Sequence, residues 1–69
     1  MKLKEIRTQK GMTQESVAKG VGVTNQAICN YEKGKREPSL YTLKRIATVL
    51  ECTVDALIED EDADDEARV

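Results

Sequence analysis

Three carboxamide side chains fall on one face of a short predicted helix, and their chemistry suits the edges of nucleotide bases. At 100° per residue, Asn25, Gln26 and Asn30 share the outer face of this segment, while Ile28 lies on the opposite face. Asn and Gln amides can form two hydrogen bonds with N6 and N7 of adenine in the DNA major groove. The alternative interpretation is an ordinary hydrated helix face, which the carboxamides alone do not exclude.

Cations follow these carboxamides directly, at Lys33, Lys35 and Arg36. The dipole of the preceding helix stabilises cations at its C-terminus in any case. Beside a helix that reads a DNA groove, however, cations in these positions are expected to contact phosphates.

The net charge of −2 conceals a segregation of charge along the chain. Residues 1–58 contain ten Lys and Arg against six Asp and Glu, a net charge of +4. Residues 59–69 contain seven acidic residues and one Arg, a net charge of −6. The basic part suits a polyanionic partner such as nucleic acid.

The elements that position these side chains are all predicted to be helices. Apolar residues recur at spacings of three and four, and β-branched runs are absent. Ser or Thr residues suited to N-caps precede four segments, and Gly11 and Gly34 suit helix C-termini. The prediction is all-α, a compact bundle of five short helices. The first three are predicted at about residues 2–10, at residues 14–21 after Thr13, and at residues 25–33 after Thr24. A fourth helix follows Ser39 and a fifth follows Thr53; the fourth has an apolar stripe of Leu40, Leu43, Ile46, Ala47 and Leu50.

The second and third of these helices carry the pattern of two helices that cross steeply over a very short turn. Ala18 is small enough for the two backbones to approach. Gly22 can adopt a positive φ and reverse the chain. Ile28 then anchors the third helix on the second. A unit of this kind presents its second helix as a rod that fits the DNA major groove.

A chain of 69 residues makes one small domain with a small core. Val54 and Ile58 add apolar surface near the end of the folded part, and we expect a second subunit to bury them. The predicted core consists of Leu3, Ile6, Val17, Ala18, Val21, Val23, Ile28, Tyr31, Leu43, Ile46, Ala47, Leu50 and Leu57.

Several classes of site are disfavoured by composition. The chain has no His, and Cys29 and Cys52 lack the spacing of a zinc site, so neither a metal nor another cofactor is expected. No nucleophile–base pair or phosphate loop is present, which argues against an enzyme. The two thiols suit a reducing cytoplasm, and no membrane span is visible.

These residues resemble the phage-repressor-type (xenobiotic-response-element) helix-turn-helix regulators. The resemblance runs from about Lys4 to Ile58 and rests on KGMTQESVAKGVGV, AICNYEKGKREPS and LKRIATVL, in that order. It implies a lambda-repressor-like DNA-binding domain with the helix-turn-helix at residues 14–33.

The resemblance also implies roles for individual residues. Gln14, at the start of the second helix, would bind a DNA phosphate together with the free N–H groups there. Arg7 and Glu32 match a partly buried ion pair that ties the first helix to the third. The recognition surface would comprise Thr24, Asn25, Gln26 and Asn30, with Lys33, Lys35 and Arg36 on flanking phosphates.

Together these features predict a sequence-specific, double-stranded DNA-binding transcription regulator. We expect a cytoplasmic repressor that binds a palindromic operator as a homodimer. The alternative is a protein-interaction module of the same fold, a partner regulator or antitoxin in which DNA binding is secondary or lost. A regulatory protein partner is left open.

The predicted DNA-binding domain comprises residues 1–58, and residues 59–69 form an acidic tail. This tail is too polar to offset the entropy of ordering it, so we expect it to be disordered. Its charge opposes that of the basic part, and we expect it to act as a mild electrostatic brake on DNA binding.

Overall fold

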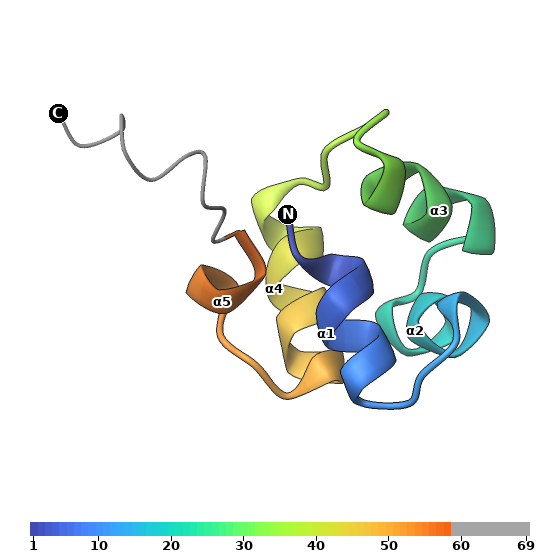
Figure 1. Cartoon of the computed structure of the whole chain (residues 1–69). Helices are drawn as coiled ribbons and strands as arrows, with labels where there is room; N and C mark the ends of the chain where they lie inside the picture. Colours follow the sequence, from blue (N-terminus) through green and yellow to red (C-terminus); the bar gives the residue numbers. More distant parts are fainter. Residues whose placement is uncertain (59–69) are drawn as a thin grey trace, which may run out of the picture.

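The computed structural model describes residues 1–58, and within them five helices are joined by short turns (Figure 1). The expectations for residues 59–69 lie outside the described residues. The helices are α1 (Leu3–Gln9), α2 (Gln14–Val21), α3 (Asn25–Lys33), α4 (Leu40–Leu50) and α5 (Val54–Ile58). The predicted all-α architecture is confirmed. The bounds of the first three helices agree with the predicted ones to within a residue at each end, and α4 and α5 begin directly after the predicted caps Ser39 and Thr53.

Side-chain caps start four of the helices where the sequence places them. Thr13 and Ser16 form a reciprocal capping box at α2, in which the Ser16 N–H donates to Thr13 Oγ1 over 3.0 Å. Thr24, Ser39 and Thr53 accept from the backbone N–H groups of Ala27, Thr42 and Ala56. Each cap satisfies a backbone donor that the helix itself leaves unpaired.

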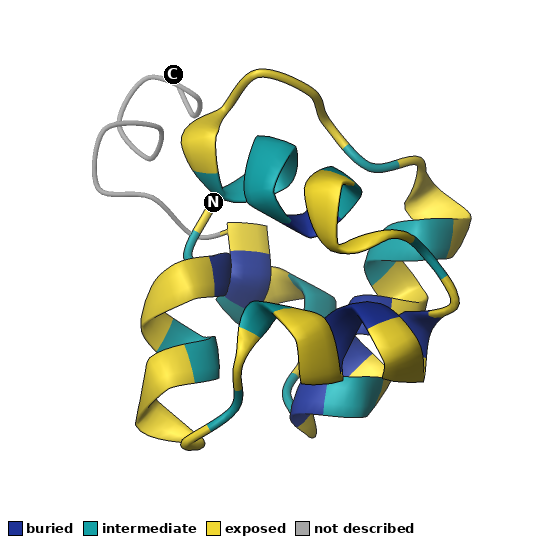
Figure 2. Cartoon of the chain, turned by 90° about the vertical axis from the view of Figure 1, so that its right-hand side faces the viewer, coloured by how far each residue is buried: buried dark blue, intermediate teal, exposed yellow. Residues whose placement is uncertain are grey.

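The core lies where the helices face one another, and exposed residues cover the outside (Figure 2). α2 packs against both α3 and α4, α5 packs on α4, and α1 packs on α3. The fully enclosed side chains are apolar and come from all five helices: Leu3, Val17, Ala18, Val21, Ile28, Ile46, Ala47, Leu50 and Leu57. The other four predicted core residues, Ile6, Val23, Tyr31 and Leu43, pack against this cluster and are partly buried.

One expectation about an apolar residue needs correction. Leu40 shares the predicted stripe of α4 but is 64% exposed, since it is the first residue of the helix and Leu43 is the first leucine to reach the core. Val54 packs partly against the chain's own core, and its burial by a second subunit stays a prediction. Ile58, in contrast, is 48% exposed.

Gly20 provides a close approach that the sequence did not suggest. A Cβ at Gly20 would lie 3.1 Å from both γ-methyl carbons of Val49, so the missing side chain lets α2 and α4 pack tightly. Arg45 of α4 strengthens the same contact, because its Nε donates to the carbonyl of Val21 at the end of α2 over 2.8 Å.

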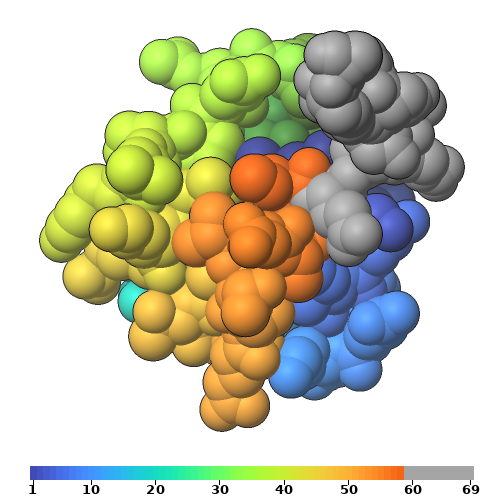
Figure 3. Space-filling model, turned by 90° about the vertical axis from the view of Figure 1, so that its left-hand side faces the viewer, coloured from blue at the N-terminus to red at the C-terminus, as the bar shows by residue number. Residues whose placement is uncertain are grey.

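The two ends of the domain are hydrogen-bonded to each other. The backbone N–H of Lys2 donates to the carbonyl of Leu57 over 2.7 Å. α5 therefore lies on the surface beside the N-terminal residues as well as on α4 (Figure 3).

Cys29 and Cys52 are free thiols, each partly buried. Burial raises the pKa of the Cys52 thiol above its usual value, against the opposing effect of the Lys10 charge. Within residues 1–58, no helix has the length and apolarity needed to cross a bilayer.

The turn between α2 and α3 depends on Gly22, which has φ +91°. A Cβ at this position would meet only Arg45 Nη2, at an ordinary 3.8 Å, so the penalty for a side chain is backbone strain rather than a clash. We expect Gly22→Ala to lower the free energy of unfolding by about 1–2 kcal/mol, measured by urea denaturation. Gly22→Asn is the matched control and should cost less, because Asn tolerates the left-handed region. Equal losses for the two variants would contradict this explanation.

Candidate nucleic-acid interface

The outer face of α3 presents the predicted carboxamides. Asn25 and Gln26 are exposed and Asn30 is partly buried, whereas Ile28 on the opposite face is fully buried. Gln26 Nε2 donates to Asn30 Oδ1 over 3.3 Å, one helical turn away. This bond joins two amides into one surface of donors and acceptors, which is the chemistry needed to pair with base edges.

Thr24 has a structural contact as well as a place on this surface. Its Oγ1 accepts from the Ala27 N–H over 3.0 Å and so caps α3. The residue is exposed, and its methyl group and hydroxyl stand at the end of α3 that carries Asn25 and Gln26.

A shallow depression of about 300 Å³ connects α3 with the loop that follows it. Three of the predicted recognition residues line it together with a predicted phosphate contact, which brings the two groups to one concave surface. Its lining residues are Thr24, Gln26, Ala27, Asn30, Tyr31 and Arg36.

The predicted cations stand in or beside the loop that ends α3. Lys33, Lys35 and Arg36 are all exposed. Gly34 has φ +77°, and the Lys35 N–H donates back to the carbonyl of Asn30 over 3.0 Å. The loop therefore folds against the end of α3, and the Arg36 side chain lines the depression that Gln26 and Asn30 also line.

Gln14 stands at the start of α2, where it is partly buried. The N–H groups of Ser16 and Val17 are bonded to Thr13, which leaves those of Gln14 and Glu15 without a hydrogen bond inside residues 1–58. Two free donors and the positive end of the helix dipole favour an anion there.

Arg7 and Glu32 form the ion pair that the family resemblance implies. Arg7 Nε lies 2.7 Å from Glu32 Oε2, and Arg7 Nη2 donates to Glu32 Oε1 over 3.3 Å. Both side chains are nearly enclosed, with 11% and 5% of their surface exposed. The remaining Arg7 nitrogen, Nη1, donates to the Met12 carbonyl over 2.9 Å, so the pair also holds the loop before α2.

One link was missed by the sequence reasoning. Gln14 Nε2 donates to Glu32 Oε1 over 2.9 Å, which connects the predicted phosphate contact to the predicted ion pair. Eighteen residues separate the partners, so no helical spacing could indicate it. The structure thus brings Arg7, Gln14 and Glu32 together on one side of α3. On another side it brings together the carboxamides of Gln26 and Asn30 and the Arg36 side chain from the loop after α3.

Within residues 1–58, the structure shows no cluster of His, Cys, Asp or Glu that could hold a metal ion. The arrangement is instead a protruding helix with hydrogen-bonding side chains and exposed cations beside it. These features define a helix-turn-helix unit.

Comparison with known proteins agrees with that class. A helix-turn-helix family model matches residues 3–57, almost the whole of the described chain. The chain therefore belongs to the phage-repressor-type helix-turn-helix family.

Named relatives are transcriptional regulators. The SPbeta prophage-derived regulator YonR of Bacillus subtilis is 40% identical over 58 residues, which cover 84% of this chain and 54% of YonR. A helix-turn-helix transcriptional regulator of Methanothermobacter thermautotrophicus is 47% identical over 62 residues, 87% of this chain and 90% of that protein. The transcriptional activator BcrR of Enterococcus faecalis is 38% identical over 61 residues, 88% of this chain and 30% of BcrR.

The chain spans about half the length of the Bacillus relative. No solved structure gave a significant match.

Proposed function

We propose that this chain is a sequence-specific, double-stranded DNA-binding transcription regulator. The observation that carries the proposal is the outer face of α3, where Gln26 and Asn30 form one hydrogen-bonding surface with the exposed Arg36 beside it. Carboxamides serve direct readout of base edges, and cations at the rim serve phosphates. In this proposal α3 lies in the major groove, and the protein works in the cytoplasm.

We further propose that it represses transcription. A compact domain bound at an operator can act by excluding other proteins from that site, and residues 1–58 form such a domain. BcrR is named as an activator, so membership of the family does not decide between the two effects.

The proposed function is tested by selecting binding sites from random duplex DNA and measuring affinity by fluorescence anisotropy. Selected duplexes should bind about 10³-fold or more tightly than scrambled ones. The logarithm of the binding constant should fall linearly with the logarithm of salt concentration. Equal affinity for both duplexes would instead favour the protein-interaction module.

Two substitutions separate base readout from phosphate contact. We expect Gln26→Ala to cost about 1–3 kcal/mol on the selected site and to relax preference at one base position. Arg36→Ala should weaken all duplexes similarly and reduce the salt slope by about one. Lys4→Ala, which removes an exposed cation from α1, is the control for net charge. If Arg36→Ala changed base preference while Gln26→Ala did not, the proposed placement of α3 would be wrong.

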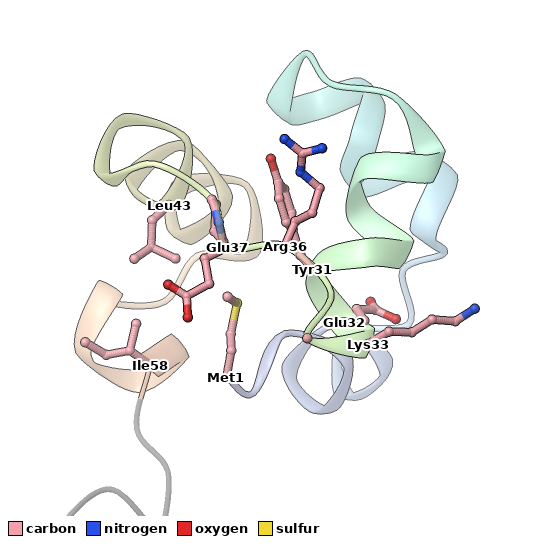
Figure 4. Close-up of a pocket in the computed structure, with 10 residues that line it drawn as sticks. Met1, Tyr31, Glu32, Lys33, Arg36, Glu37, Leu43 and Ile58 are labelled. Atoms are coloured by element: carbon pink, nitrogen blue, oxygen red, sulfur yellow. The ribbon is translucent and has the colours of Figure 1, made fainter.

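We propose a homodimer that forms through α5. Ile58 is half exposed and, with Met1 and Leu43, lines the apolar part of a depression of about 450 Å³, which Lys33, Arg36 and Glu37 also line (Figure 4). In this proposal the second subunit covers the exposed apolar side chain of Ile58 and leaves Lys33 and Arg36 to the DNA phosphates. A two-fold dimer would place two α3 helices about 34–36 Å apart, one turn of DNA, and so read a palindrome.

A charge at Ile58 tests the dimer. Ile58→Glu should shift sedimentation toward the monomer and weaken operator binding, while the far-ultraviolet circular dichroism of the fold is retained because the side chain is already half exposed. Leu40→Glu is the matched control, since it charges an equally apolar side chain that is 64% exposed at the start of α4. Dissociation by Leu40→Glu alone would move the interface to α4.

A further inference from the structure

We infer that Glu32, held by Arg7, is a positioning residue that orients the Gln14 side chain toward a DNA phosphate. The inference rests on the proposed DNA-binding function and assigns a task to an ion pair that would otherwise only join α1 to α3. Three side chains from three helices form the relay: Arg7 of α1, Gln14 of α2 and Glu32 of α3.

The chemistry of the carboxylate determines which way the amide points. A carboxylate only accepts hydrogen bonds, so the NH₂ group of Gln14, and not its carbonyl oxygen, must face Glu32. Glu32 Oε1 takes one of the two N–H groups over 2.9 Å. The second N–H of the same group remains available as a donor for a phosphate oxygen.

Arg7 makes a carboxylate tolerable at such a place. A bare carboxylate beside a phosphate would repel it, but two guanidinium nitrogens of Arg7 bond to both oxygens of Glu32. The pair is nearly enclosed, with only 5% of the Glu32 side chain exposed, so its geometry is protected from water. The relay is thus neutral as a unit.

The relay also reaches the backbone before α2. Arg7 Nη1 donates to the Met12 carbonyl, two residues ahead of Gln14. The side-chain donor and the free backbone donors of Gln14 and Glu15 are therefore held relative to each other. Fixing donors before binding lowers the entropy lost when a phosphate is bound.

A cycle of variants separates positioning from simple stabilisation. Gln14→Ala should weaken binding to the selected duplex about tenfold or more, as expected for one hydrogen bond to a charged group. The paired replacement Arg7→Met with Glu32→Leu removes the relay, leaves the net charge unchanged and replaces an enclosed ion pair by apolar side chains, a change that folded proteins often tolerate. It should cause a loss similar to that of Gln14→Ala, and adding Gln14→Ala to it should change the affinity less than twofold.

The site of the loss is read by ethylation interference on the duplex. The same phosphate should stop interfering in Gln14→Ala and in the paired replacement, while phosphates contacted by Lys35 and Arg36 stay unchanged. Glu15→Gln is the electrostatic control, because it removes an exposed negative charge from the same helical turn without touching the relay. It should strengthen binding to the same degree with and without the relay.

A second readout needs no DNA. In the free protein, nitrogen-15 relaxation should show the Gln14 side-chain amide to be ordered and that of exposed Gln9 to be mobile, and the paired replacement should make the two alike. If that replacement does not fold, Glu32→Gln serves instead, because it removes the negative charge and replaces one of the two acceptor oxygens by an NH₂ donor, which should loosen the Gln14 amide partly.

The outcomes distinguish the two proposals. A mobile Gln14 amide in the unaltered protein, or independent and multiplicative losses in the cycle, overturns the relay and leaves the DNA-binding proposal standing. An ordered amide in a protein that prefers no duplex overturns the proposed function and, with it, the assignment to phosphate.

Discussion

The reversal of the chain at Gly22 is the constraint on which the rest of the structure depends. With φ +91°, Gly22 and the next residue both direct their N–H groups at the Ala18 carbonyl, which ends α2 within one residue. Thr24 then starts α3, and Ile28 is fully buried four residues later. Because the inner face of α3 is anchored this soon after the turn, the direction of its outer face is also determined. A longer or looser turn would leave the carboxamide face free to rotate relative to α2.

The charged side chains of this domain differ in role according to how far they are buried. The enclosed pair of Arg7 and Glu32 is neutral and joins α1 to α3, and its bond with Gln14 adds α2. The cations Lys33, Lys35 and Arg36 are exposed and have no carboxylate within ion-pair distance inside residues 1–58. Exposed cations stay hydrated, so they lower the stability of the fold little. They contribute strongly to the affinity for a nucleic acid, because their binding to phosphates releases counterions. Burying a charge carries a much larger desolvation penalty unless the charge is paired. A buried ion pair therefore contributes mainly by fixing the positions of the groups it joins. Arginine therefore serves different purposes in the interior, at Arg7, and at the surface, at Arg36.

Much of the fold could be predicted because its signals are local. N-cap residues, glycines at helix ends and apolar spacing each act within a few residues, and they predicted the first three helices to within a residue at each end. The features that could not be predicted depend on tertiary contacts between segments far apart in the sequence. They are the contact of Gly20 with Val49, the exposure of Leu40 and the hydrogen bond from Gln14 to Glu32. Of the candidate site, the division of α3 into two faces followed from periodicity, whereas the depression shared with Arg36 required the conformation of the loop.

The hydrogen bond between Lys2 and Leu57 has a consequence for how the domain is made. It joins the second residue of the chain to the last residue that the structure encloses in the core, so it cannot form until nearly the whole domain has been synthesised. Contacts of such long sequence separation close large loops and are made late in folding. α2, in contrast, packs against both α3 and α4, and these contacts do not involve the N-terminal residues. The backbone of Lys2 is therefore secured only when α5 is in place, although it comes before every helix of the domain in the sequence.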